Sequence, residues 1–374
     1  MTVISQPESK LNRSWAGWAG HRLTQDELNA VTAAHARFIR HMPQGARAQL
    51  GSANILGLDL SRRLLKEADF SGADLTGSYL TGANLEGANL FSATLCGCDL
   101  GSANLRKADL RGVSLRGANL SFSVLDGADL RAAFMFKVGG DGGYARNLST
   151  TKDNAGGGVD FSNCSMKGTS MNEVNLKGAS FRNALLQGVS FKRAKLSDVV
   201  LDGAILTQMN PEELPFSAEA LKTCLLDPSA DAIKRAPEVT ERLRLHELWY
   251  ASNGKEGAPA ELDGEDFRPL GKIFCGRKIT AFVARNAIAA GIDFTNCQLQ
   301  GAHFDGSDLR DADFSGADLR GASFRGAKLA HARFKGADLK PLKLEDGEMK
   351  AVDLSDAEYS AAQFADTALA AGPA

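Results

Sequence analysis

The sequence predicts an all-β solenoid, in which short strands joined by sharp bends stack as successive coils. Three features lead to this fold class: a large apolar residue recurs every five positions, a small residue usually stands two before it, and glycine is common two after it. A period of five fits neither a helix nor a strand. Two inward residues in every five suit a short strand that bends before the next, so stacked coils bury them against each other.

The five-residue period fills three runs of the chain. Every fifth residue is large and mostly aliphatic or aromatic over positions 50–135, again over 161–206, and again over 294–369. The second run is shifted by one position relative to the first. Because only 44% of the chain is hydrophobic, runs this regular indicate a repeating core rather than a biased composition.

Within these runs, the stretches ADFSGADLTG, GANLEGANL, LRGANLS and DADFSGADLRGASFRGAKL resemble the pentapeptide-repeat family. The resemblance covers roughly 48–135, 159–206 and 291–370. It implies a right-handed, four-sided (quadrilateral) β-helix with four pentapeptides per coil. Residues twenty apart would then stack on one side, about 4.8 Å apart at the usual strand spacing. Some members of this family resemble a DNA duplex in size, shape and negative charge, and bind bacterial DNA gyrase in its place.

The central residues of the third run alternate strictly between Phe and Leu over its first ten positions. With four sides to a coil, this alternation places every Phe on two opposite sides. We expect Phe294, Phe314 and Phe334 to form one internal column, with Phe304 and Phe324 in the facing one. Stacked rings would fill the interior and fix the register of the coils.

Residues 24–42 are predicted to form a helix that covers the open end of the first coil. Thr24 and Glu27 have the spacing of a capping box, and an apolar stripe follows them. The stripe consists of Leu28, Val31, His35, Phe38 and Met42. A helix in this place would cover apolar side chains and free strand edges that the solenoid would otherwise expose.

Two further segments interrupt the repeat. The segment after the second run is predicted to hold a helix from Ser217 to Leu226 and another that opens near Pro237, because proline is favoured at the first helical position. The glycine-rich segment 136–158 is predicted to be a flexible loop. A phosphate-binding loop would need a following helix and a Lys-Ser or Lys-Thr pair, and the segment has neither.

The helix and turn that precede each solenoid look duplicated. HARFI begins at His35 and is followed by GARAQL at 45–50, while HELWY begins at His246 and is followed by GAPAEL at 257–262. We interpret the two histidines as partly buried residues of two equivalent caps. A ligand or acid–base role is the alternative, although neither histidine has a second metal-binding side chain at a suitable spacing.

These assignments divide the chain into four parts. The first, 1–47, is an N-terminal segment with a helical cap. The second, 48–210, is a pentapeptide-repeat β-helix that carries the glycine-rich loop at 136–158. A helical connector and second cap occupy 211–256, and a second pentapeptide-repeat β-helix occupies 257–374.

Composition and charge limit the possible function. Charged residues make up 24% of the chain and nearly cancel, which leaves a formal net charge of -2 and argues against direct binding of nucleic acid or of an anionic membrane. The N-terminus lacks the features of a signal peptide, and no apolar stretch is long enough for a membrane span. We therefore expect a cytoplasmic protein.

The cysteines are interpreted as structural, and no catalytic, cofactor-binding or metal-binding residue is predicted. Six cysteines in 374 residues do not make a disulfide framework. Cys98, Cys164 and Cys297 stand two before a central residue, where small buried residues are expected. No nucleophile elbow, zinc signature or phosphate loop stands apart from the repeat. An enzyme is therefore not expected, and no cofactor is implied.

Arg37, Arg40, His41 and Arg47 form a small basic cluster near the first cap. A solvated helix face is one interpretation of this cluster, and a docking patch for an acidic partner is the other.

The long, regular surface of a solenoid favours a non-enzymatic interaction or scaffold protein that binds a protein partner. The alternative is a DNA-mimicking protein that binds a DNA topoisomerase such as gyrase and modulates or protects it. Residues 48–135 carry nine acidic and eight basic side chains, and residues 291–360 carry thirteen and nine. A duplex mimic needs an uncompensated negative surface, so this balance favours the scaffold.

One side of the third run is predicted to stack Asp318, Asp338 and Glu358, which stand twenty residues apart. Arg320 and Lys340 lie two residues further on and would run beside this acidic column. We expect the column to be largely neutralised.

Overall fold

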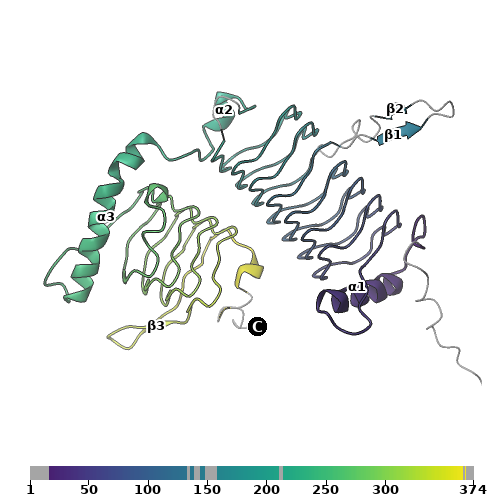
Figure 1. Cartoon of the computed structure of the whole chain (residues 1–374). Coiled ribbons are helices and arrows are strands. Elements are labelled where there is room, and N and C mark those ends of the chain that lie inside the picture. The colour runs from purple at the N-terminus through teal and green to yellow at the C-terminus, as the bar shows by residue number, and fades with distance from the viewer. Residues whose placement is uncertain are drawn as a thin grey trace, which may run out of the picture. The chain divides into compact units, whose positions relative to one another are not determined.

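The computed structural model places the chain in two compact units, unit 1 (Met1–Leu226) and unit 2 (Asp227–Ala374). The chain winds through stacked coils in each unit (Figure 1). The residues that the structure describes are 17–132, 135–138, 144–147, 158–209, 214–364 and 367.

Parallel bridges join each coil to its neighbours. In unit 1, Asp74 bridges both Asn54 and Thr94, and the same spacing of twenty residues recurs along the runs. The backbone N–H of Leu75 donates to the Thr94 carbonyl at 2.8 Å, and that of Asp74 donates to the Ala53 carbonyl at 2.9 Å. A coil therefore contains twenty residues, or four repeats of five.

Each repeat contributes a single bridging residue and not the short strand that the sequence predicts, because the chain bends too soon after it. The second residue after each central position lies in the left-handed region, with φ of 64°, 70° and 65° at Gly72, Gly77 and Gly82. Glycine adopts this conformation at little cost, which explains its frequency there. Ser52 and Arg62 take the same conformation at equivalent positions.

The core of unit 1 consists of the central residues and the small residues two before them. From Leu50 to Leu130 every central residue is at most 3% exposed. In the second run, every fifth residue from Phe161 to Leu206 is buried except Leu196, which is half-buried. Each fully buried side chain of this size contributes roughly 1.5–3 kcal/mol.

A hairpin interrupts the coils of unit 1. Strand β1 (Met135–Val138) pairs antiparallel with β2 (Tyr144–Asn147), so Met135 opens a strand instead of ending the first run. Beyond the hairpin, Asn119 bridges Asp160 across 41 positions, which means that 21 residues are inserted into one coil. The predicted loop at 136–158 therefore contains strand β2 and all of β1 except Met135. Residues 139–143 and 148–157 lie outside the described part of the chain.

Helix α1 (Gln25–Ile39) covers the first coil of unit 1, and the capping box at its N-terminus is confirmed. Its predicted apolar stripe is only partly correct. Leu28, Val31 and His35 are buried, but Phe38 is 39% exposed and Met42 is 50% exposed. The helix ends at Ile39, so Met42 lies beyond it and is not part of its buried face.

Helix α2 (Ala218–Leu221), which Ser217 caps, is shorter than predicted. It ends early because the chain returns to the coil pattern, where Leu225 bridges Ile205. Phe216 and Cys224 pack against the core of unit 1.

Unit 2 begins with helix α3 (Ala230–Ala251), which Ser229 caps. Pro237 therefore lies inside the helix and not at its first position, because the serine cap already starts the helix seven residues earlier. The short 3-10 helix η3 (Arg268–Leu270) lies in the first coil. That coil contains two additional residues, since Glu261 bridges Val283.

The aromatic columns of unit 2 are confirmed. Ring centroids of Phe294 and Phe314 lie 5.0 Å apart, those of Phe314 and Phe334 lie 5.3 Å apart, and both pairs are stacked. Phe304 and Phe324 stack at 5.6 Å in the second column. Rings of different columns meet edge to face, as Phe314 and Phe324 do at 82°.

A second hairpin corrects the predicted end of the third run. Strand β3 (Leu342–Lys343) pairs with β4 (Met349–Lys350), and Ser323 bridges Asp353 across thirty positions. Ten residues are therefore inserted into this coil. Because ten is a multiple of five, the sequence period passes through the hairpin unchanged.

Four predicted inward positions within or after this insertion are not buried. Leu344 and Leu354 are half-buried, Met349 is 59% exposed and Tyr359 is 38% exposed, while Leu369 lies outside the described residues. Phe364, in the 3-10 helix η4 (Ala361–Phe364), is buried and stacks on Phe334 at 4.7 Å.

Candidate interaction surfaces

A buried histidine links the cap of unit 1 to the first coil. His35 is fully buried, its Nδ1 accepts from the Ala48 backbone N–H at 3.1 Å, and its Nε2 lies 3.0 Å from the Lys66 carbonyl. A third hydrogen bond runs from the Ala46 N–H to the Ala34 carbonyl at 3.1 Å. The imidazole thus joins the helix, the turn after it and the coil.

The cap of unit 2 repeats this arrangement. The Nδ1 of His246 accepts from the Ala260 N–H at 3.0 Å, and its Nε2 lies 2.9 Å from the Thr280 carbonyl. The Ala258 N–H donates to the Leu245 carbonyl at 3.2 Å. We call these three hydrogen bonds the histidine clamp.

The turn glycine of each cap is fixed by close packing. A Cβ on Gly45 would lie 2.4 Å from the Phe38 backbone nitrogen, and one on Gly257 would lie 2.1 Å from the Leu245 carbonyl oxygen. No side chain fits at either position, so glycine lets the turn approach the helix closely enough to form the clamp.

The clamp requires a neutral imidazole with its proton on Nε2, because Nδ1 accepts a hydrogen bond while Nε2 donates one. Burial lowers the pKa of His35 and of His246 from the ordinary value. Both histidines are therefore structural residues at neutral pH, as their interpretation as capping residues requires.

The inward cysteines are buried, and each thiol also donates a hydrogen bond. Cys98 donates to the Leu75 carbonyl at 2.9 Å, and Cys297 to the Phe274 carbonyl at 2.7 Å. Ser78 makes the equivalent bond to the Ile55 carbonyl at 2.6 Å. These residues are thus small polar side chains whose hydrogen bonds are satisfied, rather than the simple hydrophobes that the sequence suggests.

Burial raises the pKa of the Cys98, Cys164 and Cys297 thiols to about 12. The reactive thiolate is therefore scarce at neutral pH. These three cysteines are suited to packing and not to nucleophilic or redox chemistry.

Many outward carboxylates are neutralised within their own repeat. Where Asp is followed two positions later by Arg, the guanidinium donates to both carboxylate oxygens. In one such pair, Nε of Arg320 donates to Oδ1 of Asp318 at 2.9 Å, and its Nη2 donates to Oδ2 at 2.7 Å. Arg111 holds Asp109 in the same way. Burial would raise the pKa of Asp318, but the bonds from Arg320 outweigh it and lower that pKa. Paired charges of this kind reduce the free negative surface of the coils.

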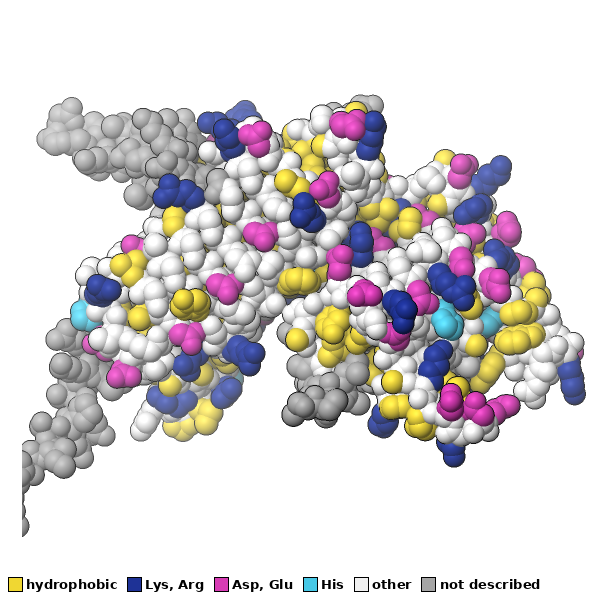
Figure 2. All heavy atoms as spheres, turned by 180° about the vertical axis from the view of Figure 1, so that it is seen from behind, with side chains coloured by type: hydrophobic (Ala, Val, Ile, Leu, Met, Phe, Trp, Pro, Cys, Tyr) yellow, Lys and Arg dark blue, Asp and Glu magenta, His cyan; other side chains and the backbone are white. Residues whose placement is uncertain are grey.

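The predicted acidic column in unit 2 is only partly correct. Asp318 does bridge Asp338, but the hairpin shifts the stacking by ten residues and places Glu358 on Lys328. Arg320 lies 3.9 Å from Asp338, and Lys340 lies 4.0 Å from it. On the face in Figure 2, Lys and Arg side chains alternate with Asp and Glu, and no broad area carries one sign.

The basic cluster at the first cap is exposed except for Arg37, which is half-buried. Arg37 donates to the Gln44 carbonyl and Arg47 to the Glu67 carbonyl, so both bind backbone oxygens and not carboxylates. Arg40 and His41 are also exposed, beside the exposed Phe38. This end of unit 1 therefore combines cationic and apolar side chains.

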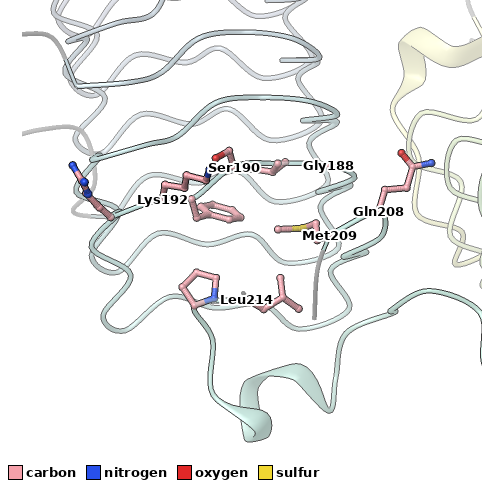
Figure 3. Close-up of a pocket in the computed structure, with 10 residues that line it drawn as sticks. Gly188, Ser190, Lys192, Gln208, Met209 and Leu214 are labelled. Carbon is pink, nitrogen blue, oxygen red and sulfur yellow. The ribbon is translucent and has the colours of Figure 1, made fainter. Parts of the chain in front are cut away.

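A hollow of about 290 Å³ lies at the last coil of unit 1, between the 188–193 stretch and Met209, Leu214 and Pro215 (Figure 3). The side chains that surround it include Lys192 and mostly apolar or small residues. No His, Cys or carboxylate is among its described wall residues.

Two further properties concern the described residues alone. No group of three or more His, Cys, Asp or Glu side chains there is arranged to hold a metal ion. Among the helices that the structure describes, none has both the length and the apolar character to cross a bilayer.

The repeat and the stacked coils define a class of solenoid proteins. The family profile for pentapeptide repeats matches eight copies, at residues 46–82, 68–106, 95–131, 157–193, 169–208, 284–316, 307–340 and 317–356. These matches cover more than half of the chain, and the chain therefore belongs to the pentapeptide repeat family. Among curated proteins, no sequence matches significantly.

Several solved structures are similar to this chain. One is HetL, a pentapeptide repeat protein involved in heterocyst differentiation regulation from the cyanobacterium Nostoc sp. strain PCC 7120; it is 19% identical, with 84% of this chain and 98% of that chain covered and a TM-score of 0.25. Rfr23 from the cyanobacterium Cyanothece 51142 is 21% identical, with 39% and 82% covered and a TM-score of 0.20.

Full-length QnrB1, a plasmid-mediated fluoroquinolone resistance protein, is 16% identical, with 83% of this chain and 92% of that chain covered and a TM-score of 0.17. TM-scores this low carry no information about function.

Proposed function

We propose that this protein is a non-enzymatic scaffold whose solenoids, built as right-handed four-sided β-helices, bind a protein partner on their outward sides. The proposal rests on the different roles of the inward and the bridging residues within each repeat. The inward residues are used entirely for the core, while the bridging residues present a ladder of polar side chains on each side. Solenoids commonly use such extended surfaces for binding.

Four consecutive bridging residues sample the four proposed sides of unit 1. They are Tyr79, Asn84, Asn89 and Thr94. Tyr79 is 55% exposed, and exposed tyrosine is enriched at protein interfaces.

The test changes each of these four residues to Arg and measures how much partner the full chain captures from the cells that make it. We expect the variant on the binding side to lose at least about tenfold of the captured partner, while its melting temperature stays within the range of the other three. Equal capture by all four variants would show that the sides of unit 1 do not bind.

Duplex mimicry with a gyrase-like topoisomerase is the weaker hypothesis. The Asp-x-Arg pairs neutralise carboxylates that a mimic would need to display. We therefore expect the purified protein to leave DNA supercoiling by gyrase unchanged, and inhibition at stoichiometric amounts would restore the mimicry hypothesis.

We further propose that the protein works in the cytoplasm. All six cysteines are free, which fits a reducing compartment.

A further inference from the structure

The end of unit 1 carries cationic side chains that form no ion pair within the described chain. On the coils, most arginines are paired with Asp or Glu, as in Arg106–Asp126. At the first cap, Arg37 and Arg40 have no carboxylate partner among the described residues. We define the cap face as Arg37, Phe38, Arg40, His41 and Met42; it surrounds two exposed apolar side chains with positive charge.

The tip of the hairpin in unit 2 carries the opposite charge, although Lys343 and Lys350 stand in the two strands below it. We define the hairpin tip as Glu345, Asp346, Gly347, Glu348 and Met349, all exposed. Among the described residues its three carboxylates form no ion pair, and Met349 is 59% exposed. The tip is thus acidic with an apolar side chain beside it.

The hairpin tip has a defined shape. The Leu344 N–H donates to the Glu348 carbonyl at 2.8 Å, and the Glu348 N–H donates to the Asp346 carboxylate at 2.9 Å. At its base, Leu342 packs on Gly321, where a Cβ would lie 2.7 Å from the Leu342 Cβ. A tip that is already ordered loses little conformational entropy when it binds.

The solenoid does not need this hairpin. Ser323 bridges Asp353 and Lys328 bridges Glu358 past it, so the coils close without its ten residues. At the cap face, Arg37 donates to the Gln44 carbonyl and Phe38 stacks on His35, but the side chains of Arg40, His41 and Met42 are exposed. The fold therefore does not account for these three exposed side chains or for the hairpin tip.

We propose that the hairpin tip of one copy docks on the cap face of a second copy. The two surfaces have opposite charge, and each exposes apolar side chains that a complementary contact would cover. The contact joins different surfaces, so one copy of a pair keeps a free cap face and the other keeps a free tip, and the assembly extends head to tail. This inference goes beyond the proposed function, because it requires no other protein.

The contact is small and charged, so the association is weak and depends strongly on salt. We would measure the mass of the full chain by analytical ultracentrifugation, from low to high micromolar concentration, at about 0.05 M and about 0.5 M salt. The average mass should rise with concentration at low salt and return to that of the monomer at high salt.

Charge reversal identifies the surfaces. Arg40→Glu and Glu348→Arg should each weaken association at least about tenfold, and the double variant should recover most of it. Arg116→Glu is the matched control, because Arg116 is exposed on a coil without an ion pair among the described residues; it should associate like the original chain.

Three results would overturn the proposal. They are a monomer under all conditions, association that Arg40→Glu leaves unchanged, and equal weakening by Arg40→Glu and Arg116→Glu. Each of these leaves the proposed function intact, because partner capture there is measured on the sides of unit 1 and not on its cap face.

Discussion

The two units begin with the same cap and continue with different cores. Each cap uses one buried histidine, one turn glycine and the same three hydrogen bonds. Behind the cap, unit 1 stacks mostly leucine, whereas unit 2 stacks phenylalanine in two columns. The cap thus depends on particular donors and acceptors, while a core of stacked coils can be built from either leucine or phenylalanine.

The phenylalanine columns should make unit 2 more sensitive to changes of shape. A stacked or edge-to-face ring pair contributes about 0.5–1.5 kcal/mol beyond the area it buries, and Phe314 has such neighbours above, below and beside it. Leucine columns lack this directional contribution. The following predictions test the comparison between the units.

The largest effect is expected from Leu85→Asp, which places an unpaired charge in the fully buried core of unit 1. We expect a loss of at least about 3 kcal/mol and loss of amide protection throughout unit 1, but not in unit 2. Hydrogen exchange read by mass spectrometry would show this. Simultaneous loss of protection in both units would mean that they fold as one.

Arg116→Asp is a suitable outward control for this experiment, because Arg116 is exposed. Thr81 is less suitable than its outward position suggests, since its hydroxyl donates to Asp99 at 2.8 Å.

The second prediction compares the two cores. Phe314→Ala should destabilise unit 2 by about 3–5 kcal/mol, and Phe314→Leu by about 1–2 kcal/mol, because leucine keeps much of the volume but loses the ring contacts. Chemical unfolding of both variants provides the measurement. If Phe314→Leu were neutral, the columns would act only as bulk and the contrast with unit 1 would disappear.

The two hairpins show how far the sequence could predict the fold. The first inserts 21 residues, one more than a multiple of five, so the period slips by one and the interruption is visible in the sequence. The second inserts ten, so Leu344 and Met349 stay in phase and imitate core positions. Periodicity reports the phase of a repeat, and it cannot report a hairpin that restores that phase.

The candidate surfaces were predictable to a similar extent. The spacing of His35 and His246 from the glycines that follow them indicated two equivalent caps, and the structure adds the hydrogen bonds that make them so. Glu358 was placed wrongly because its partner depends on the hidden insertion. The exposure of Phe38 also depends on how the helix packs against the coil. The periodicity of apolar residues along the helix gives no information about that packing.

The third prediction concerns the histidine clamp. His35→Ala leaves the Ala48 N–H and the Lys66 carbonyl without their partner in a buried place, so it should cost unit 1 about 2–4 kcal/mol. His41→Ala, on the exposed cap face, should change stability by less than about 0.5 kcal/mol. Urea unfolding of the two variants measures the difference. Similar values for both would show that the clamp does not stabilise the cap.

The fourth prediction is a pH dependence that both units share. Burial lowers the pKa of both clamp histidines, whereas in the unfolded chain histidine titrates near about 6.5. Below that pH the unfolded state binds more protons than the folded state does. The stability of the folded state is therefore highest above about pH 6.5 and falls with the pH. Each histidine lowers the free energy of unfolding by up to about 1.4 kcal/mol per pH unit.

Aspartates with lowered pKa values, such as Asp59, whose carboxylate accepts hydrogen bonds from Ser61, lose their contribution only below about pH 4. Urea unfolding between about pH 7.5 and 5 therefore isolates the histidines. The gap in stability between the original chain and His35→Ala should narrow as the pH falls. A constant gap would show that His35 does not titrate in this way.

The smallest effect is expected at the inward thiols, where the two units should behave alike. Cys98 in unit 1 and Cys297 in unit 2 each donate to the carbonyl of a central residue one coil earlier. Replacement by alanine should cost about 1 kcal/mol in either unit, because that carbonyl loses one hydrogen bond. Replacement by serine should be nearly neutral, since Ser78 makes the same bond in a neighbouring coil. Differential scanning calorimetry with and without reducing agent would measure both effects, and the reducing agent itself should leave the melting temperature unchanged, since the cysteines are free. If alanine were tolerated as well as serine at both positions, the thiols would act only by filling space, and the original interpretation of small hydrophobes would be sufficient.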